Sequence, residues 1–235
     1  MTLTKLPNFG VHVKKINAEQ HINNMLQDVQ GPALHIGSKI EVLDKWQNWR
    51  EACSEIGYYG IDIVDGPGVD FVCDITFPVD KIRKILGVKT FGLIIAPHLL
   101  EHVKKPWIAA KNIQKLLARD GKLFISVPWV QAYHDFPADY WRFSFSGLDE
   151  LFDDIHFLSR WYSGTNDAIG FQIAKNETED FSMDHLKLEP NLFQIKLEHL
   201  PEQNVEFEDN IPKFEISEGY MPIMAVNAIG EKLKK

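Results

Sequence analysis

The feature of this sequence that most constrains its fold is an alternation, from residue 32 to residue 162, of short apolar runs with amphipathic patterns of helical period. Such alternation is typical of a parallel β-sheet covered by helices. The run 91–96 is continuously apolar, as expected for a strand that is buried on both faces. The sequence therefore predicts an α/β fold built on one sheet.

Individual elements follow from apolar spacing and from turn residues. Pro106 suits the first turn of a helix, residues 119–121 read as a turn, and Ser146 with Asp149 resembles a capping box. The expected strands are 33–36, 58–63, 69–73, 91–96, 123–127, 155–162 and 221–229, and the expected helices are 39–55, 79–86, 106–117 and 146–152.

The chain divides into four segments of one domain, since 235 residues suit one large domain with an appendage. We expect an N-terminal cap segment at 1–30, a core at 31–163, an acidic insertion at 164–218, and a final strand and tail at 219–235. The net charge of −8 arises from residues 176–218, which contain 12 acidic residues and only three lysines. This insertion is expected to be a lid or a homodimer contact, with a solvated, partly mobile insertion as the alternative.

Composition and charge argue against several classes of protein. Lys and Arg are scattered, so no basic face for nucleic acid is predicted. The longest apolar runs are too short to span a membrane, and the first residues lack the apolar core of a secretory signal, so we expect a cytoplasmic protein. Two cysteines, Cys53 and Cys73, are too few for a disulfide scaffold or a Cys-rich zinc site and are expected to be buried free thiols.

Two acidic residues stand where neighbouring strands should end. Asp62 follows the second predicted strand and Asp74 follows the third. Ligands of open α/β sheets bind outside the carboxyl ends of the strands, where one carboxylate can accept ribose hydroxyls and another can reach an adenine edge. Asp is also a common turn and cap residue, which is the alternative for each acid alone. With Gly37 after the first strand, the pair favours an adenosine site.

Five blocks of the sequence occur in a characteristic order: 34–39, 59–74, 99–102 with Pro106 and Trp107, 116–123, and 134–143. In this order they resemble the blocks of class I S-adenosylmethionine-dependent methyltransferases. The likeness is greatest to the small type-11 domains, including ones associated with glycan or secondary-metabolite methylation, and it spans about residues 32–155.

The resemblance implies a Rossmann-like sheet of seven strands, mostly parallel with the last strand antiparallel, and with helices on both faces. It implies S-adenosyl-L-methionine as cofactor, Asp62 on its ribose, Asp74 near its adenine, and a methyl acceptor above the fourth and fifth strands. The residues expected at the cofactor are His35, Gly37, Ser38, Asp62, Ile63, Asp74, Ile75, Pro97 and His98.

The first block departs from the family pattern at two positions. His35 stands where an acid normally helps to hold the amino group of the methionine moiety, and Lys39 stands where a second glycine is usual. A histidine cannot replace a carboxylate as an anionic acceptor. A catalytically degenerate relative that binds or scaffolds is therefore the alternative to an active enzyme.

The segment His98-Leu-Leu-Glu-His102 literally matches the His-x-x-Glu-His pattern of inverted zinc proteases. On a helix, His98 and His102 would share a face and could bind zinc. Pro97 and a buried strand precede the segment, and no third ligand is marked downstream. We therefore expect no metal here, with a zinc hydrolase as the less favoured alternative.

The richest segment for chemistry is 128–145, which holds seven aromatic residues interleaved with charged ones. Aromatic faces between polar groups suit a sugar ring, an aromatic acceptor or a sulfonium cation, although a loop packed on the sheet edge is the structural alternative. A hydroxyl acceptor benefits from a base of near-neutral pKa, for which His134 is the first candidate and His102 the second. The residues expected at the substrate are Tyr133, Asp139, Trp141 and Arg142.

The pair Asp139 and Arg142 has two interpretations. The two side chains could orient the base or bind a substrate carboxylate or phosphate, or they could pair with each other to brace the loop. The sequence as a whole thus predicts a methyltransferase that acts on the hydroxyl of a glycan, a nucleotide-sugar or another small molecule.

Overall fold

The computed structural model describes residues 4–5, 12–39, 48–131, 133–134, 137–164, 169–174, 207–208, 211–212 and 224–233. The described helices are α1 (Ala18–Gln27), α2 (Trp49–Ala52), α3 (Val79–Leu86), the 3-10 turn η1 (Leu100–His102), α4 (Pro106–Leu116) and α5 (Phe145–Leu151). The described strands are β1 (Thr4–Lys5), β2 (His12–Asn17), β3 (Ala33–Ile36), β4 (Tyr58–Asp62), β5 (Phe71–Val72), β6 (Phe91–Pro97), β7 (Leu117–Val130), β8 (Ile155–Ser163), β9 (Ile169–Ala174), β10 (Phe207–Glu208), β11 (Ile211–Pro212) and β12 (Met224–Lys232).

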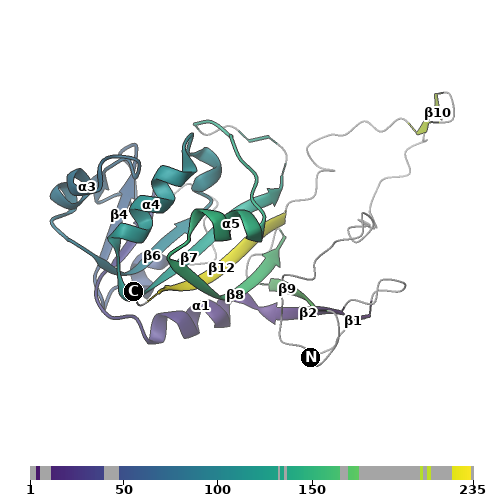
Figure 1. Ribbon diagram of the computed structural model, residues 1–235, viewed down its shortest axis with the longest axis horizontal. Coiled ribbons are helices and arrows are strands. Elements are labelled where there is room, and N and C mark those ends of the chain that lie inside the picture. The colour runs from purple at the N-terminus through teal and green to yellow at the C-terminus, as the bar shows by residue number, and fades with distance from the viewer. Residues whose placement is uncertain are drawn as a thin grey trace.

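One large sheet runs through the molecule (Figure 1). Its order is β1-β2-β9-β8-β12-β7-β6-β3-β4-β5, and the seven strands from β5 to β8 have the order 3-2-1-4-5-7-6 when numbered along the chain. The pairs from β5 to β7 are parallel, whereas β12 is antiparallel to both of its neighbours. The predicted Rossmann-like methyltransferase sheet, mostly parallel with its last strand antiparallel, is confirmed.

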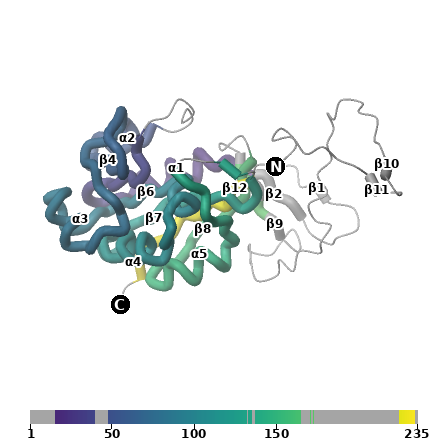
Figure 2. The backbone as a smooth tube through the Cα atoms, turned by 90° about the horizontal axis from the view of Figure 1, so that it is seen from above, coloured from purple at the N-terminus to yellow at the C-terminus, as the bar shows by residue number. Residues whose placement is uncertain are grey.

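Helices cover both faces of this sheet (Figure 2). One face packs against α3, α4 and α5 through a core that includes Ile82, Ile113 and Leu148. The other packs against α1 and α2 through a second core that includes Ile22 and Trp49. Burial of β6 from Phe91 to Ala96 agrees with its continuous apolar run, because a strand covered on both faces has no polar side.

Local signals explain several helix ends. Asn17 caps α1 by accepting a hydrogen bond from the amide of Gln20, and Pro106 occupies the first turn of α4 as predicted. Gly87 ends α3 with a φ of 66°, a left-handed conformation that favours glycine.

Some predicted boundaries are wrong. The cap of α5 is Ser144, which accepts from the amide of Gly147, so the helix begins before the expected Ser146. Residues 119–121 do not separate a helix from a strand, because β7 already begins at Leu117 and bends there, with Asp120 at a φ of 58°. The last strand lies three residues later than expected, at Met224–Lys232. Residues 40–47 of the predicted helix 39–55 lie outside the described residues.

Three strands extend the sheet beyond the seven of the core. β9 pairs with β8 and with β2, and β2 pairs with β1. The expected N-terminal cap segment therefore contributes β2 and α1 to the sheet and its cover, while most of the predicted insertion 164–218 lies outside the described residues. Within the described part of the chain, no helix is long and apolar enough to cross a membrane.

Candidate functional site

Polar side chains collect where the parallel strands end. We call one group the β3–β5 end; it consists of residues 37–39, Asp62 and Asp74. The other group, the β6–β7 end, consists of residues 97–102 and the described residues between 131 and 142. Because β5, β4, β3, β6 and β7 are parallel neighbours, both groups lie at one edge of the sheet.

Asp62, the last residue of β4, keeps spare acceptor capacity. Its Oδ2 accepts a hydrogen bond from the amide of Lys39 at 3.4 Å, and its Oδ1 accepts one from the amide of Val64 at 3.2 Å. A carboxylate oxygen can accept about two hydrogen bonds. The neighbouring Ile63 is half exposed, so an apolar surface lies beside a carboxylate that can still accept from hydroxyl groups.

Asp74 accepts two hydrogen bonds, as Asp62 does, but both are on one oxygen. Its Oδ1 accepts from both the amide and the hydroxyl of Thr76, each at 2.7 Å. The following Ile75 is buried. Asp74 thus organises its own turn through one oxygen, in keeping with the turn role that Asp often has.

The loop after β3 brings backbone and hydroxyl groups next to Asp62. The amides of Gly37 and Ser38 both donate to the carbonyl of Ile61, at 2.9 and 3.0 Å. Gly37 has a φ of 78°, which a residue with a side chain rarely adopts. The Ser38 hydroxyl is buried and has no hydrogen-bond partner among the described residues. This hydroxyl lies against Gly60 of β4, and a buried polar group without a hydrogen-bond partner there suits a polar ligand group.

His35 is held in the interior as a neutral imidazole. Its Nδ1 lies 2.8 Å from the hydroxyl of Tyr58, and its ring packs against that of Trp49. Burial, with a smaller effect of the Arg50 charge, lowers the pKa of His35 to about 3. Its Nε2 has no hydrogen-bond partner among the described residues. His35 therefore cannot supply the negative charge that an acid would bring to this position.

At the β6–β7 end, Glu101 is fully buried in η1. Neither of its carboxylate oxygens has a hydrogen-bond partner among the described residues. Side-chain nitrogens within 4 Å of Oε1 include Nδ1 of His98, at 3.4 Å, and Nε2 of His102, at 3.9 Å. In the sequence, Glu101 is visible only as the acid of the His-x-x-Glu-His pattern, four residues after the end of a buried strand.

The arrangement of His98 and His102 differs from that of a helical zinc motif. His98 precedes η1 in a turn with a φ of 47°, and its side chain is 45% exposed. His102 closes η1, and its Nδ1 lies 2.8 Å from the carbonyl of Ala138. Since a carbonyl only accepts, Nδ1 of His102 carries the proton, and in the neutral ring the lone pair is on Nε2.

His134, Asp139 and Arg142 form one network in the loop after β7. Asp139, which is almost fully buried, accepts from the backbone amide of His134 at 3.0 Å and from Nη2 of Arg142 at 2.6 Å. The hydrogen bonds from Arg142 hold the pKa of Asp139 well below its usual range. Arg142 also donates to the carbonyl of Gln131. Arg142 and Asp139 therefore pair with each other and brace the loop.

The network also orients the two candidate bases. Nδ1 of His134 lies 3.3 Å from Oδ2 of Asp139, and the rings of His102 and His134 meet edge to face with centroids 4.9 Å apart. Because a carboxylate attracts a nitrogen that bears a proton, this contact favours the proton on Nδ1 of His134 and the lone pair on Nε2 when the ring is neutral. The structure thus brings together His102, His134, Asp139 and Arg142, four of the predicted site residues.

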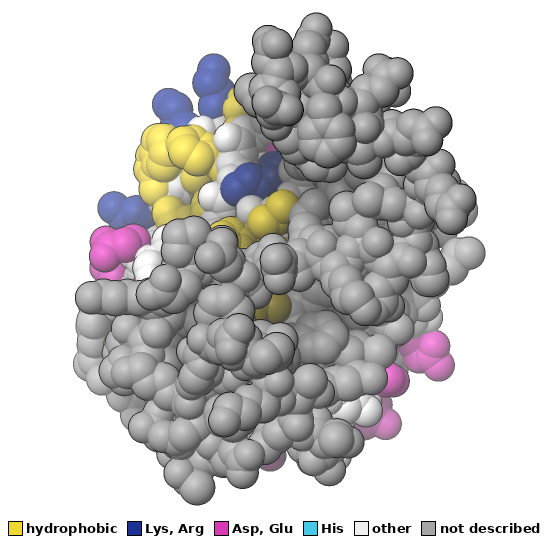
Figure 3. Space-filling model, turned by 90° about the vertical axis from the view of Figure 1, so that its right-hand side faces the viewer, with side chains coloured by type: hydrophobic (Ala, Val, Ile, Leu, Met, Phe, Trp, Pro, Cys, Tyr) yellow, Lys and Arg dark blue, Asp and Glu magenta, His cyan; other side chains and the backbone are white. Residues whose placement is uncertain are grey.

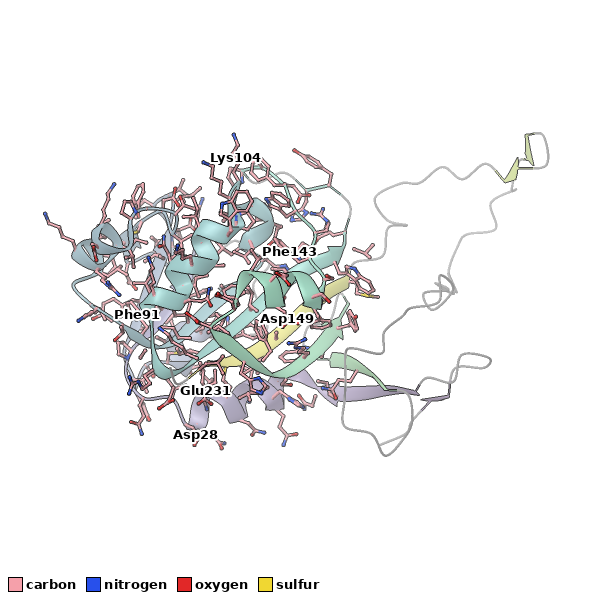
Figure 4. All side chains as sticks on the ribbon, in the orientation of Figure 1. Asp28, Phe91, Lys104, Phe143, Asp149 and Glu231 are labelled. Atoms are coloured by element: carbon pink, nitrogen blue, oxygen red, sulfur yellow. The ribbon has the colours of Figure 1, made fainter. Side chains whose placement is uncertain are left out.

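Aromatic side chains near this network are exposed. The Trp141 ring stands edge to face with that of Trp107, and its Nε1 donates to the carbonyl of Val103 at 3.1 Å. Tyr133 is 67% exposed. Phe143 instead anchors the loop in the core, near the middle of the view in Figure 4, whereas Lys104 lies at the upper edge. On the face shown in Figure 3, hydrophobic side chains gather beside Lys or Arg side chains.

Comparisons of sequence find no relative, since no family model and no curated protein matches the chain. Comparisons of structure find solved methyltransferases. The 1,6-didemethyltoxoflavin-N1-methyltransferase of Burkholderia thailandensis, solved with S-adenosylhomocysteine, has a TM-score of 0.47 and 16% identity over 67% of this chain and 77% of its own.

Two further solved structures are similar to the same degree. The N-methyltransferase NodS of Bradyrhizobium japonicum has a TM-score of 0.43 and 14% identity, over 68% of this chain and 88% of its own. The YcgJ protein of Bacillus subtilis has a TM-score of 0.48 and 12% identity, over 93% of this chain and 99% of its own. With the strand order 3-2-1-4-5-7-6 and an antiparallel seventh strand, the chain has the class I S-adenosylmethionine-dependent methyltransferase fold.

Proposed function

We propose that the protein is an S-adenosylmethionine-dependent methyltransferase that methylates a hydroxyl group of a small molecule, with a glycan or nucleotide-sugar as the first acceptor class. The observation that carries the proposal is the position of two polar clusters at one edge of the sheet. Asp62 and Ser38 offer hydrogen-bond acceptors that a nucleoside can use. His102 and His134 follow the carboxyl ends of β6 and β7, the next two strands of the sheet.

The β3–β5 end fits the cofactor. Asp62 would accept the ribose hydroxyls with its remaining lone pairs, and Asp74 would reach the adenine edge through Oδ2. Hydrophobic surface for the adenine comes from the half-exposed Ile63 beside Asp62. When bound, S-adenosylmethionine supplies a methyl group on a sulfonium, and the neutral thioether of S-adenosylhomocysteine is the leaving group. The remaining residues proposed at the cofactor are His35, Gly37, Ile75, Pro97 and His98.

The β6–β7 end would handle the acceptor. Methyl transfer from a sulfonium is an in-line displacement, so alignment of the two reactants supplies much of the catalysis. We assign the removal of the acceptor proton to Nε2 of His134, because Asp139 fixes the opposite nitrogen of the ring. His102 is the second candidate, since the Ala138 carbonyl fixes its ring in the same way.

Specificity is assigned to the aromatic and charged residues of the loop. Tyr133 and Trp141 are exposed and offer flat faces, which suit a sugar ring or an aromatic acceptor. Asp139 and Arg142 use their hydrogen bonds on each other, so we assign them chiefly to positioning His134.

A catalytically degenerate relative is the competing function, and one observation favours it. The neutral, buried His35 cannot provide the charge of the usual acid, which removes one contact from the cofactor. The two functions differ at the first step, since an enzyme must bind its methyl donor.

Calorimetry with S-adenosylmethionine and S-adenosylhomocysteine tests the proposal before any acceptor is known. We expect one binding site, and Asp62→Ala should weaken binding by about 1.5–3 kcal/mol, the scale for losing hydrogen bonds to a charged group. Asp80→Ala is the matched control, since Asp80 is 89% exposed on α3. Absence of binding to the unaltered protein would favour the degenerate relative, and unchanged affinity in Asp62→Ala would refute the ribose site.

A further inference from the structure

Glu101 is a buried ionisable group that the proposed methyl transfer does not use. Its side chain is fully buried, and both carboxylate oxygens lack a hydrogen-bond partner among the described residues. A carboxylate taken out of water costs several kcal/mol unless an opposite charge or hydrogen bonds compensate. The charge of Arg142 interacts with Glu101 but no hydrogen bond reaches its oxygens among the described residues, so the group points to a further positively charged species directly beside it.

Two histidines approach Oε1 of Glu101: the partly exposed His98 at 3.4 Å and His102, whose ring orientation is fixed, at 3.9 Å. Nδ1 of His102 donates to the Ala138 carbonyl, so the Nε2 that faces Oε1 of Glu101 carries a lone pair in the neutral ring. Two acceptor atoms thus face each other across 3.9 Å. A cation between them would turn this unfavourable contact into a favourable one.

His134 brings a third donor atom to the same point. Glu101, His102 and His134 can each offer one ligand atom such that all three atoms lie within 4.8 Å of one another. Asp139 holds the opposite nitrogen of His134, as the Ala138 carbonyl does for His102. Metal-binding histidines almost always have such a carboxylate or carbonyl on their other nitrogen, which fixes the ring and raises its basicity.

We propose that Glu101, His102 and His134 bind one divalent transition-metal ion, with zinc as the reference ion. Two imidazoles and one carboxylate are a ligand set for zinc or ferrous iron rather than for magnesium or calcium, which prefer oxygen. Metal–ligand distances of about 2.0–2.2 Å place tetrahedral ligands about 3.4 Å apart, so the three side chains need to close only slightly.

The exposure of the three ligands leaves room for a further ligand on the ion. The Glu101 side chain is fully buried, whereas those of His102 and His134 are 18% and 34% exposed. Catalytic metal sites likewise combine three protein ligands with an open position. This site differs from a helical His-x-x-Glu-His zinc site, because Glu101 is a ligand and His98 is not needed.

The ion would also refine the chemistry of methyl transfer, and only this step rests on the proposed function. An acceptor hydroxyl on the open position would lose its proton more readily, since a divalent ion lowers the pKa of a bound oxygen acid. The proton would pass to solvent and the oxygen would then attack the methyl group. Nε2 of His134 would be a ligand in the metal-bound protein and the proton acceptor only in the metal-free protein.

Metal binding can be measured without methyl transfer. Untagged full-length protein, stripped with a chelator, should bind one equivalent of Zn²⁺ in calorimetry, and Co²⁺ should give the visible absorption of a four- or five-coordinate site. Mg²⁺ in excess should not compete. Glu101→Gln and His134→Ala should each weaken Zn²⁺ binding at least about 100-fold, since even the loss of an outer-shell partner typically costs 10–100-fold.

Control variants test whether the loss of Zn²⁺ binding is specific to the three proposed ligands. His156→Ala removes an exposed histidine of β8 and should leave Zn²⁺ affinity unchanged. Should Glu101→Gln fail to fold, His134→Ala still decides, because the His134 side chain is partly exposed. Less than one equivalent of Zn²⁺ on the unaltered protein, or full affinity in both variants, would overturn the metal site. Binding of S-adenosylhomocysteine is measured separately, so failure of the metal site and failure of the proposed function are distinguishable.

Discussion

The two ends of the sheet use their polar groups differently. At the β3–β5 end, the Ser38 hydroxyl has no hydrogen-bond partner among the described residues, and each Asp62 oxygen accepts one backbone bond. At the β6–β7 end, Asp139 accepts from Arg142 and from the backbone amide of His134, and its Oδ2 lies 3.3 Å from Nδ1 of the same histidine. The carboxylate of the first end retains acceptor capacity, whereas Asp139 of the second end is engaged with its own loop.

The difference shows how one edge of the sheet can bind two reactants. Hydrogen-bond acceptors that are unfilled in the free protein suit a cofactor of fixed shape, because its hydroxyl and amino groups supply the missing hydrogen bonds on binding. A catalytic imidazole instead must be held before the substrate arrives, since its ring has to present one particular nitrogen. A change at one end should therefore leave the property of the other end intact.

The largest expected effect comes from His134→Ala. Removal of a positioned proton acceptor typically costs about 10²–10⁴-fold in rate, so turnover should fall by this factor. Affinity for S-adenosylhomocysteine should stay close to that of the unaltered protein, because His134 belongs to the β6–β7 end. Formation of S-adenosylhomocysteine over a panel of nucleotide-sugars and phenols measures the first quantity, and calorimetry measures the second.

Two outcomes would contradict this separation of the ends. Normal turnover in His134→Ala would transfer the role to His102 or to no base at all. A large loss of cofactor affinity would instead place His134 in the donor site and remove the contrast between the two ends.

A smaller effect is expected from Arg142→Ala. This change leaves Asp139, whose side chain is only 2% exposed, without its main partner. Breaking a buried ion pair costs 3–5 kcal/mol, and because Arg142 is partly exposed we expect roughly 3 kcal/mol in the free energy of unfolding. Urea denaturation measures the loss.

The matched control for Arg142→Ala is Arg160→Ala. Arg160 also binds a carboxylate through two nitrogens, but its partner Asp149 is 46% exposed. An exposed pair contributes about 0–1 kcal/mol. Equal losses in the two variants would mean that Asp139 is not buried as described, and loss of cofactor binding in Arg142→Ala would mean that the brace serves both ends.

Much of the fold could be predicted from the sequence, because its signals are periodic. Three examples are the continuous apolar run of β6, Pro106 in the first turn of α4 and Gly87 at the end of α3. Each signal involves only a few neighbouring residues of the sequence. The addition of β9, β2 and β1 to the sheet could not be predicted, since strand pairing between residues 12–17 and 169–174 has no local signature. The start of α5 was misplaced because two serines, Ser144 and Ser146, offer competing caps.

The candidate site was predictable residue by residue but not as an arrangement. Asp62 and His134 stand out by position after strands, yet only the structure places the rings of His102 and His134 4.9 Å apart. The burial of Glu101 could not be read either, because it depends on how the loop after β7 covers η1. His35 could be recognised as an unusual residue, but its charge state depends on the packing of Tyr58 and Trp49 around it.

The smallest expected effect concerns His35 and the pH dependence of stability. In the unfolded chain, a histidine takes up a proton near pH 6.5, whereas burial keeps the native His35 neutral down to a pKa of about 3. Between these values the unfolded state binds more protons, so the free energy of unfolding should fall as the pH falls. For one histidine the loss between pH 7.5 and pH 5 is about 2 kcal/mol.

His35→Gln can keep the hydrogen bond to Tyr58 and should remove this loss, as urea denaturation at both pH values would reveal. His156→Gln should retain it, since His156 is exposed in the native state. Parallel pH profiles for His35→Gln and the unaltered protein would mean that His35 takes up its proton at the same pH in the native and the unfolded states, so that burial does not keep it neutral.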